Sequence, residues 1–239
     1  MENQNNHKRV PVLGIVVDSV SVPRAVEISK DYLKNDYFNV ILLAGAWLAI
    51  ESQESEEIKQ FIHIADLILP GDHNIEDAAD KSIEGMFQEE FLDQILMYLA
   101  KQEGHLCVLC DSEQQSERVI LHLQEDYPGL KVDGVVFADT DIEAMEALVN
   151  TVNGYFPDLV LPLVSIEKQV SLLLKHKDTL STKLYIGSEN LAERIFRKGD
   201  SEKDDSIIVK WLKKHLHIGK KAMDNEFWQK YRAQKENNE

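Results

Sequence analysis

Short apolar runs rich in β-branched residues alternate along this chain with segments whose apolar positions recur every three to four residues. The first pattern predicts strands and the second predicts amphipathic helices. In the second half, runs such as 105–110 and 159–164 are almost continuously apolar, which is typical of strands in a parallel sheet with helices on both faces. We therefore predict an α/β fold with a mainly parallel, Rossmann-like sheet. The predicted strands are residues 10–17, 39–43, 67–69, 105–110, 130–137, 159–164 and 184–187.

Helical periodicity fills most of the chain between these strands. The polar stretch 72–85, which follows Pro70-Gly71, lacks this periodicity and is predicted to be a loop. Residues 199–205 read as a charged linker. The predicted helices are 22–33, 46–65 with an interruption at 52–55, 87–103, 113–126, 141–153, 165–175 and 189–197.

This pattern divides the chain into an α/β domain, residues 1–205, and a helical tail, residues 206–239. Within the domain we distinguish an N-terminal half, about 10–104, from a βαβαβ half, about 105–200. The tail carries eight Lys or Arg residues and four Asp or Glu, a charge of +4, which leaves −20 on the rest of the chain. Such an asymmetry requires its own explanation.

The composition excludes some classes of protein. A hydrophobic content of 44% supplies a packed core, and a net charge of −16 argues against nucleic-acid binding, which needs a dense basic surface. Residues 1–9 are polar, and the apolar run 10–17 is far shorter than the ~20 residues that span a bilayer. We therefore expect a cytoplasmic protein.

The tail mixes aromatic and cationic residues, and two interpretations remain open. Trp211, Phe227, Trp228 and Tyr231 stand among lysines and arginines. Such a segment can lie on an anionic membrane at the inner face of the cell membrane or close over a site. Alternatively, it is a helix that packs its apolar stripe on the domain and exposes its lysines.

The two cysteines, Cys107 and Cys110, lie on one predicted strand, where their spacing points them to opposite faces. Buried core thiols are favoured over a redox or metal pair. No metal and no cofactor is predicted.

Four motifs resemble the WecG/TagA/CpsF glycosyltransferase family and follow one another in the family's order. They are a Gly-hydrophobic-Asp strand at 13–18, an Ala-Asp-hydrophobic-Pro strand at 65–70, the Tyr-Pro-Gly-Leu-Lys segment at 127–137, and Lys168-Gln169 where the family has Pro-Lys-Gln-Glu. The resemblance covers about residues 12–187. It implies transfer of an N-acetylhexosamine from a uridine diphosphate donor to a lipid-linked acceptor, in teichoic-acid or cell-envelope polysaccharide synthesis.

The family's proposed base lies in a Pro-Asp-Gly turn, whereas this chain has Pro70-Gly71-Asp72. A general base must lie within ~3 Å of its proton, so a shift by one residue can redirect the carboxylate. Asp72 and His73 are the catalytic candidates, as an acid-base pair. The competing interpretation is a local turn without chemistry.

Other substitutions affect the positions that would bind the substrate. The family's Gly-Gly after the central strand is Asp111-Ser112, where Asp111 can cap a helix and repel a phosphate. The family's Thr-hydrophobic-Asn-Ala segment and its arginine have no counterparts here. Lys168 and Gln169 could grip a substrate; the alternative for Lys168 is a solvated position on an exposed helix face.

Two function classes follow from these matches and losses. One is a divergent glycosyltransferase, and the other is a catalytically inactive relative that keeps the fold for binding or regulation. We expect a uridine diphosphate sugar or another small ligand to bind weakly.

Overall fold

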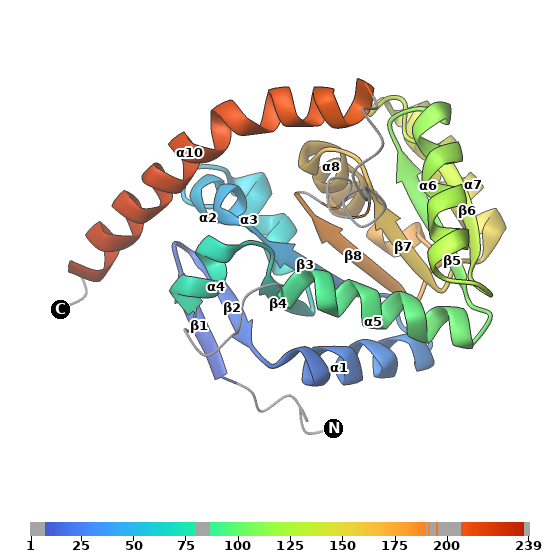
Figure 1. Ribbon diagram of the computed structural model, residues 1–239, viewed down its shortest axis with the longest axis horizontal. Helices are drawn as coiled ribbons and strands as arrows, with labels where there is room; N and C mark the ends of the chain where they lie inside the picture. Colours follow the sequence, from blue (N-terminus) through green and yellow to red (C-terminus); the bar gives the residue numbers. More distant parts are fainter. Residues whose placement is uncertain (1–7, 80–86, 190, 192–194, 196–206, 237–239) are drawn as a thin grey trace.

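The structure is a computed structural model that describes residues 8–79, 87–189, 191, 195 and 207–236. Its centre is a six-stranded sheet in the order β4-β3-β8-β7-β5-β6, and every neighbouring pair is parallel (Figure 1). The predicted fold class is thereby confirmed. The strands are β3 (Asn39–Ala44), β4 (Leu67–Pro70), β5 (His105–Cys110), β6 (Lys131–Val136), β7 (Leu159–Pro162) and β8 (Leu184–Ser188).

Helices cover both faces of this sheet, as the apolar strands require. The connections are α1 (Val22–Lys34), α2 (Ala46–Glu51), α3 (Glu56–His63), α4 (His73–Ala79), α5 (Phe87–Lys101), α6 (Glu113–Asp126), α7 (Ile142–Tyr155) and α8 (Ile166–His176). The interruption predicted at 52–55 is confirmed, because α2 ends at Glu51 and α3 begins at Glu56. The helix predicted at 189–197 and the linker at 199–205 lie mostly outside the described residues.

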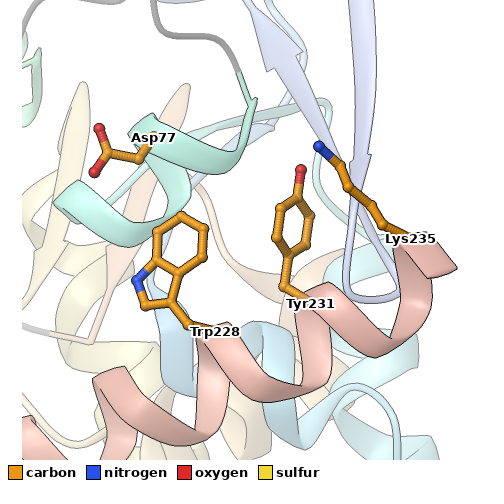
Figure 2. A pocket seen from close by; sticks show the side chains of 4 residues that line it. All are labelled: Asp77, Trp228, Tyr231 and Lys235. Carbon is orange, nitrogen blue, oxygen red and sulfur yellow. The ribbon is translucent and has the colours of Figure 1, made fainter.

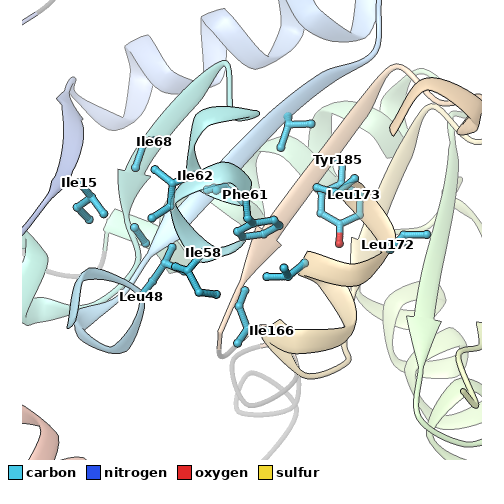
Figure 3. Close-up of a cluster of buried hydrophobic side chains, with 14 of the residues drawn as sticks. Ile15, Leu48, Ile58, Phe61, Ile62, Ile68, Ile166, Leu172, Leu173 and Tyr185 are labelled. Carbon is cyan, nitrogen blue, oxygen red and sulfur yellow. The ribbon is translucent and has the colours of Figure 1, made fainter. Parts of the chain in front are cut away.

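Alternate strand residues enter two hydrophobic clusters, one on each face. On β5, Cys107 and Leu109 join one cluster, and Leu106, Val108 and Cys110 join the other. The first cluster also receives Phe61 from α3, Leu172 from α8 and Tyr185 from β8 (Figure 3). Both thiols are buried as predicted, and burial raises the pKa of each to about 12, so neither is reactive at neutral pH.

The prediction of a single strand at 10–17 is wrong, because this region contains two strands that form an antiparallel hairpin. β1 (Lys8–Val12) pairs with β2 (Ile15–Ser19), and the turn between them has positive φ at Leu13 (44°) and Gly14 (84°). Such a turn favours glycine. The buried Asp18 side chain accepts hydrogen bonds from Arg9 Nε (2.9 Å) and Ile68 N (2.8 Å), so it fixes the hairpin to β4.

Two other expectations about the β4 region are wrong. The predicted loop 72–85 contains α4, a helix that begins directly after Asp72. The apolar run 67–69 also predicts a buried strand that neighbours those at 105–110, 130–137 and 159–164, but in the described part of the chain β4 is an edge strand that pairs in the sheet with β3 alone. The apolar pattern of a four-residue strand does not reveal its place in a sheet.

The tail forms the helix α10 (Ile207–Glu236), which passes over α2 and α4 (Figure 1). Phe227 and Tyr231 of its last turns belong to the first cluster, and Trp228 packs against that cluster. The packing interpretation is therefore confirmed for this part of the tail. Within the described residues, no helix combines the length and the apolar character that crossing a bilayer requires.

Candidate functional site

Polar residues follow the strands where they end, along the carboxyl edge of the sheet. In open α/β sheets ligands bind at this edge. Asp72 follows β4, Gly45 follows β3, Glu189 follows β8 and Asp111 follows β5. These residues and their neighbours therefore form the candidate site.

Asp72 accepts backbone hydrogen bonds at the start of two helices. Its Oδ2 accepts from Ala46 N of α2 at 2.7 Å, and its Oδ1 accepts from Ile75 N of α4 at 3.0 Å. His73, the other catalytic candidate, is the exposed first residue of α4. The carboxylate of Asp72 thus faces back toward β3.

The backbone explains why the carboxylate stands at position 72. A Cβ added at Gly71 would overlap the carbonyl group of Leu43 on β3. The turn therefore admits only glycine at 71, and its Pro-Gly-Asp order is a requirement of this local packing.

Glu189 was not predicted as a site residue, yet it meets Asp72 at the start of α2. Its Oε1 accepts hydrogen bonds from Gly45 N (3.1 Å) and Leu48 N (2.9 Å). A Cβ added at Gly45 would lie 2.8 Å from Glu189 Oε2 and 2.9 Å from Asp72 Oδ2, so both carboxyl groups face this glycine. The signal in the sequence was an acidic residue directly after a buried strand.

Electrostatics distinguish Glu189 from an ordinary surface carboxylate. Burial raises its pKa, the charge of Asp72 raises it further, and the result is a pKa of about 8. Glu189 therefore holds its proton near neutral pH. A carboxyl group with such a pKa can donate or accept a proton in catalysis.

Gln169 is fully buried and joins the ends of β7 and β8. Its Nε2 donates to the carbonyls of Val164 (3.0 Å) and Ser188 (2.8 Å). Among the described residues its Oε1 has no hydrogen-bond partner. Because Ser188 precedes Glu189, Gln169 holds the backbone from which the Glu189 side chain extends.

Lys168, Asp111 and Ser112 form a separate group at the other end of the edge. Lys168 Nζ donates to Asp111 Oδ1 (2.8 Å) and to the Phe137 carbonyl (2.6 Å). The N-cap of α6 is Ser112, whose Oγ accepts from Gln115 N at 3.2 Å. The expectation that Asp111 caps this helix is therefore wrong: the hydroxyl one residue later is the cap, and Asp111 pairs with Lys168.

The predicted residues thus form two groups. Asp72 and Gln169 lie on the same edge and are connected through Ser188 and Glu189. Asp111 follows β5, which lies four strand spacings of about 4.8 Å from β4, or about 19 Å away. A ligand that contacts both Asp72 and Asp111 must therefore span most of the sheet.

The connections leave β7 and β5 in opposite directions, toward β8 and β6, so the sheet has a topological switch point between them. Ligand-binding α/β proteins place a crevice at such a point. Here the ion pair of Lys168 and Asp111 occupies that position. In class, the chain is a doubly wound α/β protein whose ligand edge is lined with carboxyl groups.

A model of the WecG/TagA/CpsF glycosyl transferase family matches residues 10–191, and the chain belongs to this family. The resemblance inferred from the four motifs is thereby confirmed. A search of curated proteins finds no match.

Proposed function

We propose that this chain is a divergent member of its family that serves cell-envelope polysaccharide or teichoic-acid synthesis and binds uridine diphosphate sugars weakly or not at all. Family membership supports the glycosyltransferase fold and the biological setting. On this proposal the chain acts in binding or regulation, and the ancestral transfer of an N-acetylhexosamine is lost or greatly slowed.

The observation that carries the proposal is the occupation of the edge by the chain's own acidic groups. Glu189 accepts hydrogen bonds from the N–H groups of Gly45 and Leu48. Without Glu189, these donors would be available to an anionic ligand. Asp111 pairs with Lys168 at the switch point. A carboxylate ~4 Å from a phosphate charge costs about 1 kcal/mol at water-like dielectric and about 4 kcal/mol at an effective dielectric of 20.

The test is a transfer assay with purified protein, a uridine diphosphate N-acetylhexosamine and a lipid-linked acceptor. We expect no release of uridine diphosphate above the rate of spontaneous hydrolysis. Turnover at an ordinary enzymatic rate, roughly 1 per second or faster, would reject the proposal.

A second candidate function, a hexosyltransferase that retains catalysis, is favoured by one observation. The carboxyl groups of Asp72 and Glu189 face the same glycine, and Glu189 has a pKa of about 8. Such a pair could deprotonate an acceptor hydroxyl group. If turnover is found, Asp72→Asn should reduce it at least 100-fold, whereas His73→Ala should leave it nearly unchanged.

We also propose that the basic tail makes a peripheral membrane contact. Its aromatic residues Phe227 and Tyr231 are buried in the domain, so the contact would rest on the tail's positive charge. Replacing Lys213 and Lys214 by glutamate should abolish co-sedimentation with vesicles of anionic lipid. The control Lys175→Glu, at an exposed lysine of α8, should not. Equal binding by all three proteins would contradict the contact.

A further inference from the structure

A cavity of about 650 Å³ lies between α4 and α10 (Figure 2). It is lined by Asp77 of α4 and by Trp228, Tyr231 and Lys235 of α10. The three α10 residues are spaced three and four apart, so they form one stripe on the helix. A cavity of this volume accommodates a small organic ligand.

The two rings are fixed before any ligand binds. Trp228 Nε1 donates to Asn74 Oδ1 (2.9 Å), and the Tyr231 hydroxyl donates to the carbonyl of Ala78 (2.9 Å). Phe227 stacks behind Tyr231, with ring centroids 5.9 Å apart. Because these contacts hold the rings in place, a ligand would lose little free energy in ordering them.

The charged groups at this cavity have free hydrogen-bonding capacity. Within the described part of the chain, Asp77 makes no hydrogen bond or ion pair, and Lys235 Nζ makes none either but lies 5.0 Å from the centroid of the Tyr231 ring. Both side chains are exposed. The cavity thus combines apolar ring surface with one strong acceptor and one strong donor.

This combination selects against charged ligands. Lys235 repels a cation that the rings and Asp77 would attract, and Asp77 repels an anion that Lys235 would attract. A neutral ring with one apolar face and several hydroxyl groups satisfies Trp228, Asp77 and Lys235. Its C–H face packs on Trp228, because the Tyr231 ring is buried, stacked on Phe227 and in contact with Lys235. Its hydroxyl groups donate to Asp77 and accept from Lys235.

We propose that this cavity is a saccharide-binding site that takes a neutral pyranose ring. Asp77 lies on α4, five residues after Asp72, which directly precedes this helix; five residues correspond to about 7.5 Å along the helix axis. A glycan bound here would therefore approach the Asp72–Glu189 end of the edge. The inference stands on the residues of the cavity and does not require that the chain bind a uridine nucleotide.

The test is ligand-observed NMR with the full chain and methyl glycosides of N-acetylglucosamine and glucose, without any nucleotide. We expect saturation transfer to the sugar protons and a dissociation constant in the millimolar range, typical of one monosaccharide. Asp77→Ala and Lys235→Ala should each weaken binding about threefold to tenfold. Both sites are exposed, so both variants should fold normally.

Two controls make the outcome decisive. Arg232→Ala, at an exposed residue of α10 that does not line the cavity, should leave sugar binding unchanged. Choline and inorganic phosphate should give no transfer. Absence of sugar binding, equal binding by Asp77→Ala and wild type, or stronger binding of choline would each overturn the proposal.

Discussion

Different interactions occupy the two ends of the carboxyl edge. At the β4–β3–β8 end, Asp72 and Glu189 accept backbone N–H groups and α10 covers the neighbouring helices. At the β7–β5–β6 end, Lys168 pairs with an Asp111 side chain that is 53% exposed. The β4–β3–β8 end is thus held by hydrogen bonds to the backbone and by a hydrophobic cluster, whereas the β7–β5–β6 end is held by an ion pair in contact with water.

Because of this difference, the two ends should contribute unequally to the free energy of unfolding. If a carboxyl group that accepts hydrogen bonds from helix N–H groups is removed, those buried N–H groups lose their partner, which costs about 1–3 kcal/mol per group. An ion pair near the surface contributes roughly 0–1 kcal/mol and is screened by salt. Substitutions at the β4–β3–β8 end should therefore lower the free energy of unfolding far more than substitutions at the β7–β5–β6 end.

The largest expected effect is that of Phe227→Ala, at the β4–β3–β8 end. Phe227 is fully buried in the first cluster, so its removal should lower the free energy of unfolding by about 3–5 kcal/mol, measured by denaturant titration. The control Phe156→Ala, at a residue 77% exposed after α7, should change it by less than ~0.5 kcal/mol. Equal effects would show that α10 does not belong to the core.

The second largest loss in the free energy of unfolding is expected when the family's Pro-Asp-Gly order is restored at residues 70–72. Gly71→Asp combined with Asp72→Gly places a Cβ against the Leu43 carbonyl and removes both caps of Asp72, so we expect a loss of about 2–4 kcal/mol. Gly154→Ala in α7, where an added Cβ meets nothing within 4 Å, should be neutral or stabilising. A stable double variant would mean that the turn can adopt the family's order.

A pH dependence should follow from Glu189. Its pKa is raised from an ordinary 4.5 to about 8, so between these values the folded protein binds more protons than the unfolded chain. This contribution to stability is complete below about pH 4.5 and is lost as the pH rises through about 8.

The variant Glu189→Gln keeps an acceptor for Gly45 and Leu48 but cannot ionise. Its free energy of unfolding should therefore fall less than that of wild type between pH 5 and pH 9, by on the order of 1–3 kcal/mol. Glu56→Gln, at an exposed residue of α3, is the control and should follow the wild-type curve. Parallel curves for wild type and Glu189→Gln would contradict the raised pKa.

The smallest effect is expected for Lys168→Met, at the other end. The methionine keeps the apolar stem and loses the pair with Asp111, the bond to the Phe137 carbonyl and the cation–π contact with the Phe137 ring, so the free energy of unfolding should fall by ~1 kcal/mol or less in denaturant titration. A loss above about 2 kcal/mol would make the two ends energetically alike.

Local patterns predicted most of the fold. The bounds of β5 and α6 agree with the apolar run and the helical period that predicted them, because both elements are long enough for the periodicity to be clear. The β1–β2 hairpin was missed because Leu13, in its turn, has a left-handed conformation that is rare for leucine. Helix α4 was missed because it is short and polar.

The site was less accessible to sequence reasoning than the fold. Asp72 and Gln169 were identified from motifs, but their partners depend on the order of strands in the sheet. Glu189 and Gly45 are 144 residues apart and meet only because β8 pairs with β3. No local pattern encodes that pairing.

Calorimetric titration with uridine diphosphate distinguishes a degenerate donor site from a functional one. We expect no measurable heat, or a dissociation constant in the millimolar range, for the wild-type chain at pH 7. Asp111→Gly should tighten a weak interaction by about tenfold, since it removes a negative charge from the edge. Micromolar binding by the wild-type chain would contradict the account.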